Sequence, residues 1–77
     1  MWIKTHNAYL NINQYHAVSK KYVTNIGYAI VLSSPYGDIA IAERLDKAVC
    51  ERVLEAIFSN MQNGQAVISI EDIINCL

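Results

Sequence analysis

Residues 26–42 constrain the fold of this chain more than any other stretch. They read IGYAIVLSS, then PYGD, then IAIA. Apolar, β-branched and aromatic residues fill the first segment, and such residues favour the pleated surface of a β-strand. Pro35 fixes its own φ and Gly37 accepts a positive one, so the residues between the two segments suit a tight turn. The stretch therefore predicts two antiparallel strands joined by a short connection.

Shorter strand signals precede this pair. Residues 1–5, 9–12 and 15–22 alternate apolar with polar side chains, and the intervening residues 6–8, 13–14 and 23–25 suit turns. Within residues 9–12, Leu10 and Ile12 point to one face, whereas Tyr9 and Asn11 point to the other. Residues 1–45 are therefore expected to form an antiparallel β-meander.

Residues 46–62 carry the pattern of one substantial α-helix. Asp46 is the expected N-cap, because its carboxylate can accept hydrogen bonds from the exposed N–H groups of the first turn. Gly64, in the pair Asn63-Gly64, can take the positive φ that commonly ends a helix. Apolar residues recur at helical spacing and form one broad stripe, so we expect the helix to cover one face of the sheet. The stripe consists of Val49, Cys50, Val53, Leu54, Ile57, Phe58 and Met61.

Residues 63–77 allow two interpretations. In the first, residues 66–68 form a short strand, and Ser69 with Asp72 three positions later caps a last helical turn that ends at Asn75. In the second, the tail stays extended and adds a strand to the sheet edge of a partner. We favour the first. The whole chain (1–77) is thus predicted to be a single α+β domain: an antiparallel β-meander of four to five strands packed on one main α-helix, with a short C-terminal strand or helical turn.

The chain has little charge for its apolar content. Hydrophobic residues make up 53% of the sequence and charged residues only 17%, whereas about a quarter of an ordinary soluble domain is charged. Some apolar surface then remains uncovered, so we expect a homo-oligomer, a dimer or higher. The formal net charge of -1 supplies no basic field for a phosphate backbone, which argues against nucleic acid as a partner.

The sequence also indicates the cellular compartment in which the protein is expected to act. No apolar run approaches the roughly 18 to 20 residues that cross a bilayer, and no segment of signal-peptide form opens the chain. The only cysteines are Cys50 and Cys76, too few for a secreted disulfide framework. We therefore expect a cytoplasmic protein with reduced thiols and no membrane partner.

No set of residues predicts catalysis. His6, His16, Cys50 and Cys76 are chemically suited to zinc, but they lack the close paired spacing of zinc modules. Cys50 would need a nearby base to act as a nucleophile, and its place on the apolar stripe indicates a core residue instead. The isolated glycines form no phosphate-binding loop. We therefore expect no catalytic residue, no metal and no cofactor, and hence a protein that is not an enzyme.

Aromatic and amide side chains are the remaining candidates for function. Tyrosine and tryptophan combine a flat apolar face with a hydrogen-bonding group, which suits protein interfaces and stacking on bases. The same residues also fit a half-buried sheet. The candidate partner or ligand surface comprises Trp2, Tyr9, Asn11, Tyr15, Tyr28 and Tyr36.

These features favour a noncatalytic binding or regulatory module that acts through interaction with an unknown partner protein. The alternative is a small-ligand protein that holds a nucleotide-like molecule at a subunit interface. In that case tyrosine rings would stack on the base, and asparagine amides would donate and accept its hydrogen bonds.

Three segments carry a resemblance to known proteins: Trp2-Ile3-Lys4 at the start, Leu10-Asn11-Ile12-Asn13, and Ala48, Val53-Leu54 and Ile57 in the helix. In these respects the chain resembles small uncharacterised bacterial and phage proteins that open with a Trp-Ile-Lys strand and end in a helix. Its architecture is also similar to that of a small flagellar-operon protein family. The resemblance implies a β-meander followed by one helix, and a phage or prophage origin, but no reaction.

Overall fold

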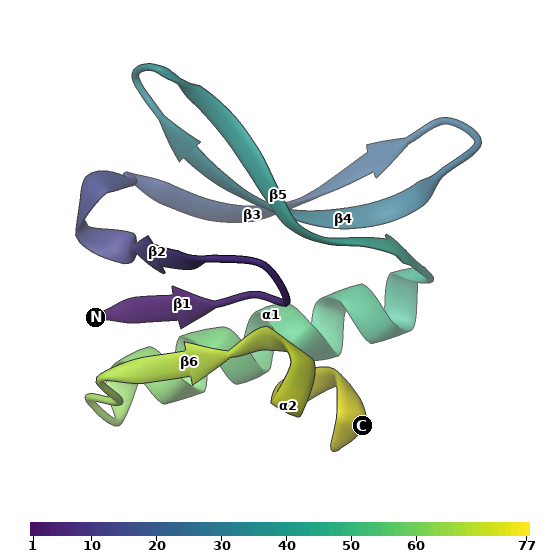
Figure 1. Cartoon of the computed structure of the whole chain (residues 1–77). Helices are drawn as coiled ribbons and strands as arrows, with labels where there is room; N and C mark the ends of the chain where they lie inside the picture. The colour runs from purple at the N-terminus through teal and green to yellow at the C-terminus, as the bar shows by residue number, and fades with distance from the viewer.

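The computed structural model describes all 77 residues and has the α+β class that the sequence predicts (Figure 1). Strands dominate the first part of the chain, and the longer of two helices follows them. Neither helix has the length and apolarity that crossing a membrane requires. In chain order the elements are β1 (Trp2–Lys4), β2 (Tyr9–Asn11), the 3-10 helix η1 (Ile12–Gln14), β3 (Ala17–Val23), β4 (Gly27–Ser34), β5 (Gly37–Leu45), α1 (Lys47–Gln62), β6 (Val67–Ser69) and α2 (Ile70–Asn75).

The strands divide between two three-stranded sheets instead of forming one continuous meander. The larger sheet is the antiparallel meander β3-β4-β5. In the smaller sheet β1 is central, antiparallel to β2 and parallel to β6. Figure 1 shows the larger sheet at the top and the helices at the bottom, with β1 and β2 between them.

The division arises at η1. The Asn11 side chain accepts a hydrogen bond from the Asn13 N–H (3.1 Å), and the Tyr15 N–H donates to the Ile12 carbonyl (3.1 Å). These bonds close a tight turn in place of further strand pairing. The second strand therefore ends at Asn11, one residue earlier than expected, and the third starts at Ala17 instead of Tyr15. The chain thus leaves the small sheet before it joins the large one.

The β3–β4 turn occupies residues 24–26, one position later than expected. The Ile26 N–H donates to the Val23 carbonyl (3.1 Å), so Ile26 belongs to the turn and not to the following strand. Gly27 begins β4 with a φ of 106°. A Cβ atom at Gly27 would lie 3.1 Å from the Leu45 carbonyl oxygen, so both the backbone angle and the close approach of β5 favour glycine.

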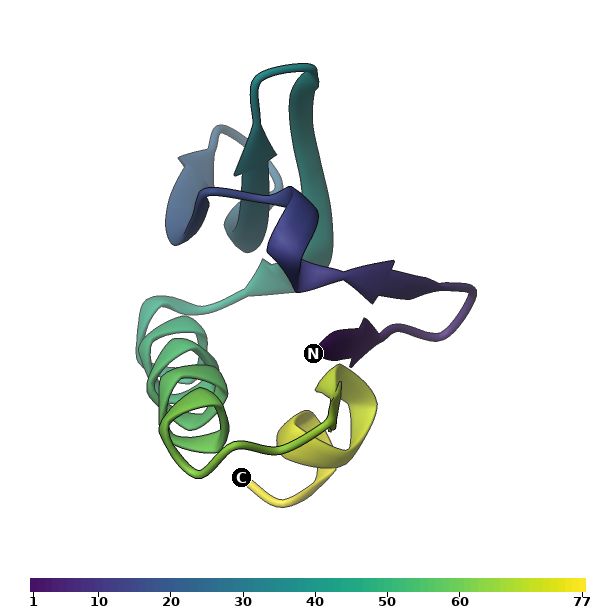
Figure 2. The ribbon, with the colours of Figure 1, turned by 90° about the vertical axis from the view of Figure 1, so that its left-hand side faces the viewer.

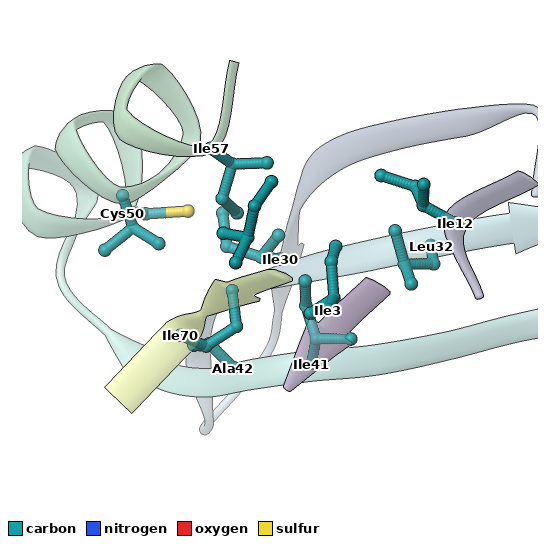
Figure 3. Close-up of a cluster of buried hydrophobic side chains, with 11 residues drawn as sticks. Ile3, Ile12, Ile30, Leu32, Ile41, Ala42, Cys50, Ile57 and Ile70 are labelled. Carbon is teal, nitrogen blue, oxygen red and sulfur yellow. The ribbon is translucent and has the colours of Figure 1, made fainter. Parts of the chain in front are cut away.

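An apolar core joins both sheets and α1 (Figure 3). Each layer presents its inward-facing side chains to the others: Ile30 from the large sheet, Ile3 from the small sheet and Ile57 from α1 are at most 1% exposed. Figure 2 shows α1 on one side beneath the large sheet and the β1–β2 hairpin on the other. The buried cluster consists of Ile3, Ile12, Ile30, Leu32, Ile41, Ala42, Cys50, Val53, Ile57, Ile68 and Ile70.

Both helices begin at the caps that the sequence predicts. The Asp46 carboxylate accepts a hydrogen bond from the Val49 N–H (2.8 Å) at the start of α1. The Ser69 hydroxyl accepts one from the Asp72 N–H (3.3 Å) at the start of α2, which ends at Asn75. The strand-then-helix interpretation of the tail is therefore confirmed, with β6 paired to β1 of the same chain.

Replacing Ile30 by alanine tests the shared core. Ile30 is fully buried, whereas Ile39 on the neighbouring strand is 38% exposed. The same substitution to alanine at both positions therefore removes the same side-chain atoms from a buried site and from a partly exposed one. We expect Ile30→Ala to lower the free energy of unfolding by about 2 to 5 kcal/mol, because it leaves a cavity among three layers. Ile39→Ala should cost less than half as much. Urea denaturation followed by circular dichroism measures both, and equal losses would contradict a core centred on Ile30.

Candidate interaction surfaces

The small sheet carries a row of side chains that point away from the core. Because Ile3, Leu10 and Ile68 face inward, the alternating residues of the same strands face outward. The register aligns Trp2 with Asn11 on one side and with Val67 on the other. It aligns Lys4 with Tyr9 and Ser69 in the same way. We call this surface the aromatic face; it consists of Trp2, Lys4, Tyr9, Asn11, Val67 and Ser69.

The aromatic face is open to solvent. Tyr9 is 61% exposed, Val67 48% and Trp2 44%. Trp2 lies on the central strand, between an amide on β2 and an aliphatic side chain on β6. Half-exposed aromatic residues next to polar groups are a composition typical of the centre of protein interfaces.

The structure brings together three of the six residues predicted to form a partner or ligand surface: Trp2, Tyr9 and Asn11. The other three lie elsewhere. Tyr15 is half-buried and packs against the core beside η1. Tyr28 is also half-buried and makes an edge-to-face contact with Tyr22, with ring centroids 5.2 Å apart. Tyr36 lies in the β4–β5 turn and is 99% exposed.

A second apolar surface lies between α1 and the edge strand β3. It is a hollow of about 500 Å³ whose walls include Val18, Leu54, Phe58 and Met61. Val18 and Met61 also line a second hollow, which extends the apolar surface to Tyr15. We call the first hollow the α1–β3 groove; it is lined by Val18, Leu54, Glu55, Ile57, Phe58, Ser59, Met61 and Gln62.

The environment of one groove residue, Phe58, differs from the sequence-based expectation. It belongs to the apolar stripe of the helix, which is expected to face the sheet, yet it is 62% exposed. The stripe is broader than the surface that covers it: Cys50, Val53 and Ile57 are buried, but β3 is the edge of the large sheet and leaves Phe58 uncovered. Helical spacing shows which residues share a side of the helix, but it does not show where the covering sheet ends.

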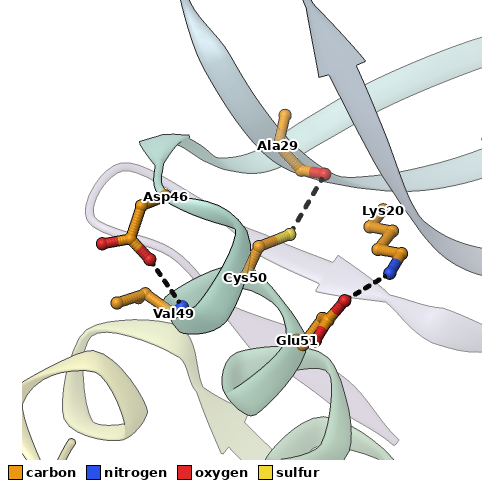
Figure 4. A network of polar contacts seen from close by, with 6 residues as sticks. All are labelled: Lys20, Ala29, Asp46, Val49, Cys50 and Glu51. Atoms are coloured by element: carbon orange, nitrogen blue, oxygen red, sulfur yellow. Dashed lines mark hydrogen bonds and ion pairs between the residues drawn. The ribbon is translucent and has the colours of Figure 1, made fainter.

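Cys50 is a core residue. It is fully buried on α1, with its Sγ 3.8 Å from the Ala29 carbonyl oxygen of β4 (Figure 4). Burial raises the pKa of the Cys50 thiol, which disfavours the thiolate that a nucleophile or a metal ligand requires. Cys76 is exposed, and neither cysteine is in a disulfide. No three His, Cys, Asp or Glu side chains are grouped in a way that would hold a metal ion.

One ion pair joins β3 to α1. Lys20 Nζ on β3 lies 2.8 Å from Glu51 Oε1 on α1 (Figure 4). The hydrogen bond from Lys20 lowers the pKa of the Glu51 carboxyl, and the same bond raises the pKa of Lys20. Both side chains are more than 40% exposed, so the pair orients β3 over α1 but adds little stability.

A third hollow, of about 270 Å³, lies between β5 and α2. Ile41 and Ile70 form part of its apolar wall, and His6, Glu43 and Glu71 supply polar side chains. All three polar residues are exposed, and the protein has no buried side-chain N or O atom without a hydrogen-bond partner. Nothing in this hollow is therefore poised to receive a specific ligand group.

Comparison with models of protein families, with curated proteins and with solved structures found no match for this chain.

The burial of Cys50 predicts unequal reactivity of the two thiols. At mildly alkaline pH we expect iodoacetamide to modify Cys76 quickly and Cys50 far more slowly in the folded protein, because the Cys50 thiol is inaccessible and has a raised pKa. In denaturant the two should react alike. Mass spectrometry of timed samples gives both rates. Modification of Cys50 as fast as Cys76 under native conditions would contradict its assignment to the core.

The ion pair predicts a specific dependence on pH. Because the pKa of Glu51 is lower in the folded state, its stabilising contribution is present above the unfolded carboxyl pKa, about 4.3. It is lost as the pH falls through the folded value. We expect Lys20→Gln to raise the pKa of Glu51 towards that of a free carboxyl, as measured by NMR titration. Lys21→Gln, which removes a charge one residue away, is the control and should leave Glu51 unchanged.

Proposed function

We propose that the protein is a noncatalytic binding module that acts through protein–protein interaction, with the aromatic face as the surface that meets its partner. The observation that carries this proposal is the outward row formed by Asn11, Trp2 and Val67 across the three strands of the small sheet. Trp2 is the single tryptophan of the chain, and it stands at the centre of that row.

The aromatic face is also preorganised. Ile3, directly after Trp2, is fully buried, and Ile68, directly after Val67, is 2% exposed. These core side chains fix the strands, so the exposed residues between them lose little freedom when a partner binds. Asn11, Ser69 and Lys4 supply hydrogen-bond donors and acceptors around the apolar centre, which matches the polar rim of ordinary interfaces.

The proposal includes a homo-oligomer that acts in the cytoplasm, with the phage or prophage origin that the resemblance implies. The low charged fraction, 17%, and the exposure of Phe58, which lies outside the aromatic face, support self-association. The net charge of -1 produces little repulsion between copies.

Capture of partner proteins tests the role of Trp2. We expect the wild-type protein, immobilised and exposed to a lysate of the source organism, to retain a partner that Trp2→Ser binds about thirty-fold more weakly, as for a central interface aromatic. Tyr36→Ser is the control, because Tyr36 is exposed and lies outside the aromatic face. With the purified partner, Trp2 fluorescence should shift to shorter wavelength on binding. A partner retained equally by Trp2→Ser and wild type would contradict this surface.

A thermal-shift screen distinguishes the alternative, binding of a nucleotide-like ligand, from binding of a partner protein. A nucleotide that binds the native state raises the melting temperature, and the protein–protein proposal expects no such rise. A rise that is lost in Tyr9→Ser and kept in Tyr36→Ser would favour the ligand alternative over the partner protein.

A further inference from the structure

We propose that Asn63 is a site of covalent modification, at which the Asn63-Gly64 pair converts to an aspartyl or isoaspartyl linkage at a rate set by the last turn of α1. The pair lies in the turn between α1 and β6, at the lower left of Figure 1. Water is the only co-reactant that the conversion requires. The inference does not depend on the binding function proposed for the aromatic face.

The reaction starts at the backbone nitrogen of Gly64. This nitrogen loses its proton to solvent base and attacks the side-chain Cγ of Asn63. The new N–Cγ bond closes a succinimide ring, and the side-chain amide nitrogen takes up a proton and leaves as ammonia. Water then opens the ring. Cleavage of the new bond leaves an aspartate, whereas cleavage of the original peptide bond leaves an isoaspartate, whose backbone runs through Cβ and Cγ.

The chain offers this reaction one favourable place. Asn63 is its only asparagine that precedes glycine. Both residues are exposed, and nothing lies within 4 Å of the position that a Cβ atom of Gly64 would occupy. Before any other residue, a side chain hinders the approach of the following nitrogen to Cγ. The asparagines with such a neighbour are Asn7, Asn11, Asn13, Asn25, Asn60 and Asn75.

The folded structure keeps the two reacting atoms apart. Asn63 is the C-cap of α1 with a ψ of 0°, which places the Gly64 nitrogen beside the Asn63 nitrogen, whereas ring closure requires it beside Cβ. The ψ angle must therefore rotate, and rotation breaks two hydrogen bonds. The Gly64 N–H donates to the Met61 carbonyl (3.1 Å). The Gln65 N–H donates to the Asn60 carbonyl (3.1 Å). Exposed hydrogen bonds at the end of a helix open locally without global unfolding.

The opening is confined to a short segment. Before it, the Asn63 N–H donates to the Ser59 carbonyl (3.0 Å). After it, the Trp2 N–H donates to the Ala66 carbonyl (2.9 Å) and holds the start of β6 against β1. Neither bond needs to break when ψ of Asn63 rotates. The turn therefore slows the modification in the folded protein without preventing it.

Modification changes the connection between α1 and the aromatic face. Either product adds a negative charge at the C-terminal end of α1, where the helix dipole is already negative. The isoaspartate also adds a methylene group to the backbone that leads into β6. Val67 of β6 pairs with Trp2 of β1. We therefore expect the lengthened connection to alter the packing of Val67 beside Trp2.

The rate of modification at each asparagine tests the proposal. The wild type is incubated at mildly alkaline pH, folded and in urea, and peptide mapping by mass spectrometry follows each site. We expect Asn63 to be modified first in both conditions, and about ten-fold more slowly in the folded protein, because two hydrogen bonds must open. Modification of another asparagine before Asn63, or equal rates in both conditions, would overturn the proposal.

Two variants locate the reaction. Asn63→Gln, whose longer side chain would have to close a larger ring, should lose the early modification. Asn75→Gln is the matched control and should behave as wild type, because Asn75 is exposed at the end of α2 but precedes Cys76. An early modification that persists in Asn63→Gln would place the site elsewhere and refute the assignment.

Fluorescence of Trp2, the single tryptophan of the chain, reports the consequence for the aromatic face. The isoaspartyl form can be separated from unmodified protein by ion exchange. We expect its Trp2 emission to differ from that of Asn63→Asp, which carries the added charge without the added methylene, and its melting temperature to be lower. Identical emission and melting of the two forms would overturn the link between Asn63 and the aromatic face.

Discussion

The structure depends on apolar contact among layers that cannot stabilise themselves. Each strand of the small sheet has three residues, and three such short strands bury too little surface to persist in water alone. Ile3 and Ile68 supply the inner face of this sheet, and Ile30 of the large sheet and Ile57 of α1 belong to the same buried cluster. Removing any one layer would expose the side chains of the others, so the elements are expected to form together.

Isoleucine suits this arrangement. Seven of the eleven residues of the buried cluster are isoleucines, and a β-branched side chain has few rotamers to lose on burial. Strands also favour it because it packs well on a pleated surface. A small core built from stiff side chains loses less entropy on folding than one built from flexible ones, which matters in a chain with only 13 buried residues.

The elements with local signals could be predicted from the sequence. Asp46, Ser69 and the Asn63-Gly64 pair mark helix boundaries through interactions with their own neighbours, and the structure places both helices where those signals predict. The parallel pairing of β1 with β6 has no such signal, because Trp2 and Val67 are far apart in the chain. The β-bulge near Arg44 could not be predicted from the sequence either. The φ of Arg44 is 59°, and arginine is not a residue that indicates a left-handed backbone conformation. Trp2, Tyr9 and Asn11 were predicted as surface residues from their aromatic and amide side chains, and for Tyr9 and Asn11 also from their alternation with Leu10 and Ile12. The exposure of Phe58, in contrast, depends on where the sheet ends.

Both exposed surfaces are held by residues of the same core. Trp2 precedes Ile3 on β1, and Phe58 follows Ile57 on α1; in each pair one side chain faces solvent while its neighbour is at most 1% exposed. A shift of either surface would therefore displace a core side chain, and close-packed interiors resist such displacement. β1 and α1 lie on different sides of the molecule (Figure 2), so the two surfaces are separate from one another. The core thus acts as a rigid support that presents two separate, partly apolar surfaces to solvent.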